Sequence, residues 1–282
     1  MSSLEKEIWA RHFRQFRILL GVYLVYHFMD LLPWAQELFG LNGALSSPSL
    51  NGTYKVFPDL IFLFNSSSVG LTVFIASLIV ASFGLIFDRF TSLCALWLWY
   101  GWACLFNANN LILNPSLSYI GWILLATAVI SWRPQTYKKL FQYAWILLGV
   151  GYFVSGWVKA QSPSWQDGSA LWHVLNNPLA RDNAFHDWLL TGPRSLYAAM
   201  TWFVLFLELA FLPLSLWHSA RPWVWLLMTA LHIGILATVG FADLTLGMLI
   251  THLFVWDPQW ELAKLFSWLA VKSKSTEPLT SA

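Results

Sequence analysis

The chain has few charged residues and almost no cysteine. Of its 282 residues, 11% are Asp, Glu, Lys or Arg and 57% are hydrophobic, and the mean hydropathy is +0.57. A soluble domain usually carries about 25% charged residues. So few charges do not cover the surface of a soluble protein of this size. The composition therefore predicts an integral membrane protein, with the lipid bilayer as its first partner.

Motifs for metals, disulfides and nucleic acids are also missing from the sequence. Cys94 and Cys104 stand within one apolar stretch, without a CxxC spacing or a histidine motif, and we interpret them as small apolar residues. No HExxH or carboxylate–histidine spacing suggests a metal, so we expect no metal site. The net charge is only +2 and the basic residues are scattered, which argues against nucleic acid as a partner. We expect no cleaved signal peptide, because no small-residue cleavage site follows the first apolar run.

Apolar stretches recur along the chain and predict an all-α, polytopic transmembrane helical bundle. Several are shorter than the roughly 20 residues that a perpendicular span needs, which is tolerated where neighbouring helices bury them. The predicted organisation is an N-terminal amphipathic helix (1–17), a transmembrane domain (18–260) and a tail (261–282). The eight predicted spans lie near 18–32, 69–87, 91–106, 118–132, 141–158, 196–217, 222–240 and 244–256.

Basic residues divide unevenly between the two predicted sides of the membrane. The positive-inside rule then places both termini and the tail in the cytoplasm, in a bacterial inner membrane or a eukaryotic endomembrane. The long connections, 33–68 and 159–195, lie on the opposite side, so we expect the outer face to carry the function. The outer side has Lys55, Lys159, Arg181 and Arg194, and the inner side has Lys6, Arg11, Arg14, Arg17, Arg89, Arg133, Lys138, Lys139, Arg221, Lys264, Lys272 and Lys274.

Ionisable side chains within the predicted spans are the candidate functional residues, because a charge inside a bilayer is costly. At 1.5 Å per residue, Glu208, His232 and His252 lie roughly 18, 12 and 13 Å from the outer ends of their spans. These three side chains are therefore expected to meet near mid-membrane. His27 and Asp30 lie one turn apart near the outer end of the first span. A single bundle would bring all of these groups to one outward-facing pocket.

Structural explanations stand beside each of these functional ones. Glu208 can be protonated and bonded to a neighbouring helix, and either deep histidine can make an interhelical hydrogen bond. His27 and Asp30 can form a local structural pair. Asp243 is expected to cap the last span.

One segment, residues 152–171, carries a more specific pattern: an aromatic run, a small residue and glycine before a lysine, then tryptophan and glycine in the outer loop. This segment resembles the signature of the HTTM (horizontally transferred transmembrane) family, which is related to the membrane domain of the vitamin K-dependent gamma-carboxylase. A glutamate in the sixth span, Glu208, and a histidine in the seventh, His232, are similar too. The pattern is formed by Tyr152, Phe153, Gly156, Lys159, Trp165 and Gly168.

The resemblance implies a role for Lys159, which matches the lysine that deprotonates vitamin K hydroquinone in the carboxylase. It implies a quinone- or vitamin K-like hydroquinone as the cofactor. An ammonium withdrawn into an apolar, tryptophan-lined site loses hydration, which makes a neutral amine available. The alternative is that Lys159 only snorkels to the interface. One place departs from the pattern, because Leu117 stands where the carboxylase has a catalytic histidine, so the resemblance does not extend to carboxylation.

Two classes of function follow from the sequence. The first is an outward-facing enzyme acting on a lipophilic, quinol-like small molecule. The second is a non-catalytic membrane accessory or transport protein with a peptide or protein partner, for example in peptide-toxin maturation or export. A purely structural role for the buried charges is a third interpretation. For the enzyme, the predicted catalytic residues are Lys159, Glu208 and His232, and the predicted substrate-binding residues are Trp165, Gly168, His27, Asp30 and His252.

Overall fold

A computed structural model describes residues 3–44 and 59–260, and this part of the chain is helical, without a β-strand beyond one isolated bridge between Ala180 and Val239. The predicted tail, 261–282, lies outside the described residues. So does 45–58, in the middle of the first outer loop. The all-α prediction is confirmed for the described residues.

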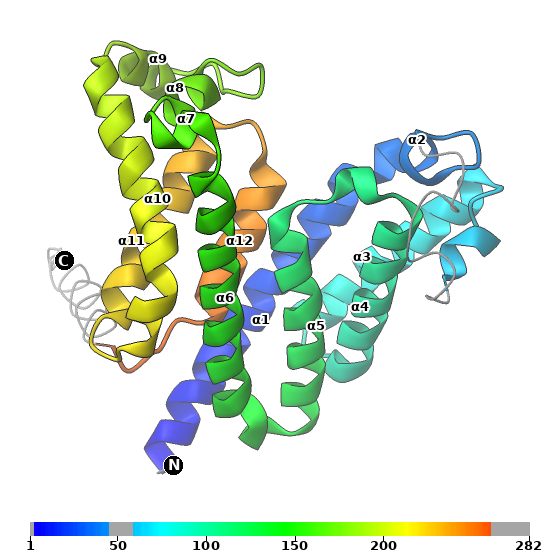
Figure 1. Cartoon of the computed structure of the whole chain (residues 1–282). Helices are drawn as coiled ribbons and strands as arrows, with labels where there is room; N and C mark the ends of the chain where they lie inside the picture. Colours follow the sequence, from blue (N-terminus) through cyan, green and yellow to red (C-terminus); the bar gives the residue numbers. More distant parts are fainter. Residues whose placement is uncertain (1–2, 45–58, 261–282) are drawn as a thin grey trace, which may run out of the picture.

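Eight helices of 13 to 29 residues run back and forth through the bundle (Figure 1). They are α1 (Ser3–Leu31), α3 (Ser68–Ile86), α4 (Thr91–Ala108), α5 (Pro115–Trp132), α6 (Tyr137–Ala160), α10 (Arg194–Leu216), α11 (Arg221–Thr238) and α12 (Ala242–Phe254). Short helices connect them: η1 (Leu32–Trp34), α2 (Ala35–Phe39), η3 (Leu60–Leu63), η4 (Asn110–Ile112), η5 (Pro134–Thr136), α7 (Pro163–Gln166), α8 (Ala170–Leu175) and α9 (Ala184–Leu190).

These helices overlap the eight predicted apolar stretches, and the predicted amphipathic helix continues into the first span as one helix, α1. Five segments are long and apolar enough to cross a membrane: α1 with the short helices after it, α3, α5, η5 with α6, and α10. Among the described helices, α4 and α11 fall outside that set, and α12 is a shorter apolar helix. Several apolar helices are thus established, and the count of eight spans stays a prediction.

Successive long helices alternate in direction, so the two ends of the bundle differ (Figure 1). One end, here called the loop end, carries α2, η3, α7, α8 and α9. The other, the N-terminal end, carries the start of α1 and the end of α12. Ring contacts agree with this arrangement, because Phe16 in the first half of α1 lies 5.0 Å from Phe254 at the end of α12.

Local sequence signals begin several helices. The Ser67 side chain accepts a hydrogen bond from the Gly70 amide at the start of α3. Asn114 likewise caps α5, accepting from the Ser116 amide, and Pro115 follows at the first helical position. Asp243 was expected to cap the last span, and this was wrong. Phe241 is the cap residue of α12 and makes no side-chain capping bond.

Two glycines of α6 allow this helix to lie close to α10, next to the candidate site. A Cβ atom on Gly156 of α6 would lie 3.1 Å from the Cβ of Glu208 on α10. One on Gly149 would lie 2.9 Å from Leu212 of the same helix. Small residues at helix interfaces let backbones approach closely, which is the usual way membrane helices pack. The glycines of α6 therefore bring Glu208 beside the half of that helix that is nearer the loop end.

Candidate functional site

The centre of the candidate site is an ion pair between Lys159 and Glu208. The Lys159 Nζ atom donates to both carboxylate oxygens of Glu208, at 2.5 and 2.7 Å, and to Ser155 Oγ at 2.9 Å. The Lys159 side chain is 28% exposed, whereas that of Glu208 is 7% exposed. A molecule arriving at the loop end therefore meets the lysine first, with the carboxylate behind it.

The side chains that face this pair from α6 follow helical spacing. Tyr152, Ser155 and Lys159 are separated by three and four residues, which places them on one face of a helix. Tyr152 is buried and lies seven residues from Lys159, or about 10 Å along the axis. The face thus leads from the partly exposed amine to a deeper hydroxyl.

Tyr152 joins two histidines from different helices. Its hydroxyl lies 2.7 Å from Nε2 of His232 on α11 and 2.7 Å from Nε2 of His252 on α12. One hydroxyl has a single hydrogen, so it donates to one ring and accepts from the other. Two neutral rings must then hold opposite tautomers. The Nδ1 atoms of both rings are buried and without a hydrogen-bond partner in the described part of the chain.

Electrostatic contact links these two groups. Glu208 interacts with Tyr152 across the helix interface, and Lys159 interacts with His232. We call the set of Ser155, Lys159, Glu208, Tyr152, His232 and His252 the Lys159 cluster. The two deep histidines meet at Tyr152, whereas Glu208 bonds to Lys159, so the meeting of all three at one functional site stays a prediction.

A second polar group, the Asp243 cluster, lies where α12 begins and α1 ends. The Asp243 carboxylate lies 2.6 Å from His27 Nδ1, and it accepts hydrogen bonds from Tyr23 at 3.0 Å and from the Asn114 amide at 3.0 Å. The Trp102 ring packs on His27 with centroids 4.5 Å apart. Four helices, α1, α4, α5 and α12, therefore meet around one carboxylate.

The Asp243 cluster lies apart from the deep histidines of the Lys159 cluster. Asp243 and His252 are nine residues apart on α12, about 13 Å along the helix. The structure thus places His27 with Asp243, not with Lys159. Asp30, one turn after His27, is exposed to the surroundings of the bundle. Of the predicted substrate-binding residues on the membrane helices, His252 alone lies within the Lys159 cluster.

The connection between α6 and α10 contributes the other two predicted binding residues. The Lys159 Nζ atom lies 5.3 Å from the centroid of the Trp165 ring, close enough for a cation–π contact. Gly168 has a φ of +81°, and a Cβ there would lie 2.7 Å from that of Ala198. Glycine is therefore required at this turn, both for the backbone conformation and for the packing of the loop on α10.

Ser155, Tyr23 and Asn114 were not selected from the sequence, and Tyr152 was named there only as part of the 152–171 pattern, not as a site residue. Their residue types are ordinary in apolar helices, and no charge draws attention to them. The signal that was available for Tyr152 and Ser155 is their spacing from Lys159 on one helical face. No group of three His, Cys, Asp or Glu residues in the described ranges is arranged to hold a metal ion.

The fold is helical, with several apolar helices, and is consistent with a multi-pass membrane protein. Comparison of the chain with models of protein families, with curated proteins and with solved structures found no match.

Proposed function

We propose that the chain is an eight-span membrane protein of the HTTM type, with both termini in the cytoplasm, whose Lys159 cluster removes a proton from a lipophilic, quinol-like substrate at the outer face. The observation that carries this proposal is the ion pair of a partly exposed lysine with a buried glutamate. A pair of this kind holds a transferable proton on a lysine that is partly exposed at the loop end.

The pair supplies a base without burying an uncompensated charge. Transfer of one proton from the Lys159 ammonium to the Glu208 carboxylate converts the ion pair into a neutral amine and a neutral acid. Both forms have zero net charge, and a low-dielectric site favours the neutral form more than water does. The amine then takes the proton of a substrate hydroxyl, which leaves an ammonium and a substrate anion. Ser155 holds the nitrogen by a hydrogen bond, and the Trp165 ring adds a cation–π contact whenever the nitrogen is the ammonium.

The deeper histidines extend the path that a proton can follow. The Tyr152 hydroxyl can pass a proton between the Nε2 atoms of His232 and His252. The two unpartnered Nδ1 atoms provide one further donor and one further acceptor. In this proposal they hold a proton or a water molecule at the buried side of the cluster while the transferred proton stays on Glu208, so they do not touch the substrate.

The experiment is mass spectrometry of small molecules that co-purify with the full chain from its membrane. Wild type is compared with K159M/E208Q, which removes both charges together and so leaves neither one buried alone. The control is K139M, at the opposite end of the same helix. We expect a quinone-like molecule with wild type and K139M and its loss with K159M/E208Q, while thermal unfolding of all three is similar.

A second candidate is the non-catalytic accessory or transport protein. The observation in its favour is that Lys159, Glu208 and Asp243 each bond to a protein partner, as in a network that only fixes helix packing. This candidate predicts that wild type and both variants carry the same bulk phospholipid and nothing else. That result would overturn the enzyme, and bound polypeptides would then be sought in the same samples.

A further inference from the structure

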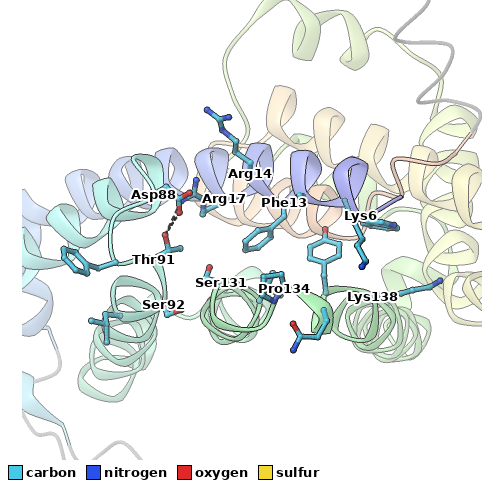
Figure 2. A pocket seen from close by; sticks show the side chains of 17 residues that line it. Lys6, Phe13, Arg14, Arg17, Asp88, Thr91, Ser92, Ser131, Pro134 and Lys138 are labelled. Carbon is cyan, nitrogen blue, oxygen red and sulfur yellow. Dashed lines mark hydrogen bonds and ion pairs between the residues drawn. The ribbon is translucent and has the colours of Figure 1, made fainter. Parts of the chain in front are cut away.

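A groove lies at the N-terminal end of the bundle, away from the Lys159 cluster. It has a volume of about 1150 Å³ and is bounded by the first half of α1, the start of α4, the end of α5 and the start of α6 (Figure 2). Sites for small molecules usually have about 300–1,000 Å³. The groove is therefore large enough for more than a polar head group.

The charge of the lining is mostly positive. Lys6, Arg14, Arg17 and Lys138 line the groove together with a single acid, Asp88. Arg17 already forms an ion pair with Asp88, and Thr91 bonds to both of them. Arg14 is exposed and close enough to Arg17 for the two like charges to interact. An anion placed beside Arg14 would relieve this repulsion.

The inner wall is apolar and contains hydrogen-bonding groups that are not used. Phe13 extends from α1 toward Ser131 and Pro134, whereas Arg14 extends from the other side of α1, away from them and toward the outside of the groove (Figure 2). Trp9 is 6% exposed, and its indole nitrogen has no hydrogen-bond partner in the described ranges. The same holds for the Ser131 hydroxyl. A cationic rim above an apolar wall with spare donors matches an anionic head group, ester oxygens and a hydrocarbon chain.

We propose that this groove binds an anionic phospholipid, with its phosphate beside Arg14 at the rim and one acyl chain against Phe13. The position of the groove in the fold is the one expected for a site that binds a phospholipid. The groove lies at the ends of α3 and α5, two of the helices that are long and apolar enough to cross a membrane. Lipid phosphates lie at that level of a bilayer, and clusters of Lys and Arg there attract anionic lipids.

The test measures binding of dioleoyl-phosphatidylglycerol to the full chain in a zwitterionic detergent, by native mass spectrometry and by the shift in Tm. Dioleoyl-phosphatidylcholine is the neutral comparison, and glycerol 3-phosphate is the soluble one. We expect phosphatidylglycerol to bind more tightly than either. Each basic residue near a membrane surface contributes about fivefold, so K6Q/R14Q should weaken phosphatidylglycerol binding about 25-fold.

The matched control is R11Q/K139Q, which removes two exposed cations at the same end of the bundle but outside the groove lining. It should keep the affinity of wild type for phosphatidylglycerol. Equal binding of the two phospholipids to wild type would overturn the proposal. So would an equal loss in the two double variants, since general surface charge would explain it. Equal binding of glycerol 3-phosphate would show a soluble phosphate ligand and would overturn the lipid as occupant.

Discussion

At the scale of single residues, the polar groups of the bundle differ most in the number of hydrogen bonds that their neighbours make to them. Asp243 bonds to Tyr23 and His27 of α1 and to Asn114, the residue before α5, whereas Asp30 near the end of α1 is exposed. Both are carboxylates near the loop end. The two carboxylates therefore differ in the number of hydrogen-bond donors around them. This number, and not the position of the residue in the bundle, decides how much each one contributes to the free energy of unfolding.

We therefore expect D243N to lower the free energy of unfolding by about 2–3 kcal/mol. The new amide group would face the donors of Tyr23 and Asn114, and the short contact of the carboxylate with His27 Nδ1 would be lost. D30N is the matched control and should change the free energy by no more than about 0.5 kcal/mol. Unfolding in mixed micelles measures both. Equal effects of the two substitutions would contradict the conclusion that the Asp243 carboxylate holds Tyr23, His27 and Asn114 together.

A histidine in α9, at the loop end, predicts a dependence on pH. His186 Nε2 lies 2.8 Å from the Leu175 carbonyl oxygen, and this hydrogen bond, with the nearby Asp187 carboxylate, raises the pKa of His186 above its ordinary 6.5. Because folding raises this pKa, the protonated ring stabilises the packing of α9 on α8 below about pH 6.5. That contribution is lost as the pH rises through the raised pKa.

Hydrogen-exchange protection factors of α8 and α9 should therefore fall above about pH 6.5. H186Q should remove this dependence on pH, and H173Q, in the neighbouring helix α8, should retain it. Protection that is independent of pH in wild type would refute the role of His186.

At the scale of helices, contact distance depends on where glycine occurs. On Gly21 of α1, a Cβ would lie 2.6 Å from Ile86 Cγ1 and 2.9 Å from the Ser82 carbonyl oxygen on α3. At Gly234 of α11, no heavy atom lies within 4 Å of the corresponding position. The first glycine is needed for the approach of two helices, and the second is not.

G21A should therefore lower the free energy of unfolding by about 1–3 kcal/mol, because α1 and α3 must move apart. G234A should raise it by about 0.5–1 kcal/mol, because alanine loses less backbone entropy in a helix. The same unfolding assay compares the two variants. A stabilising G21A would show that α1 and α3 are not packed as closely as described.

At the scale of the whole molecule, the alternating helices divide the connections between two ends (Figure 1). The eight-span proposal requires these ends to lie on opposite sides of the membrane. In a chain with Cys94 and Cys104 replaced by alanine, new cysteines at Gln135 and Ser219 test one end. Cysteines at Ser164 and Asp182 test the other.

An impermeant maleimide should label the first pair only in inside-out vesicles and the second pair only in right-side-out vesicles. The basic residues near the N-terminal end are the physical reason for this orientation. Labelling of both pairs from one side would exclude eight spans.

The class of the protein and the positions of its long helices were determined by the sequence alone. Hydropathy and run length are local properties, because each helix satisfies its own backbone hydrogen bonds within the bilayer. The cost of charge in a membrane also selected Lys159, Glu208 and the deep histidines as candidates. Neither the helix positions nor these candidate residues required knowledge of which segments contact one another.

The pairing of those residues was decided only by the tertiary structure. Glu208 lies 49 residues from Lys159, Asp243 lies 216 from His27, and His252 lies 100 from Tyr152. Helices that are apolar on all sides carry little periodic signal for which face turns inward. Helix order and rotation are set by close packing at glycines such as Gly156, and these contacts form only between segments distant in the chain. That is why the sequence pointed to one polar pocket and the fold contains two clusters.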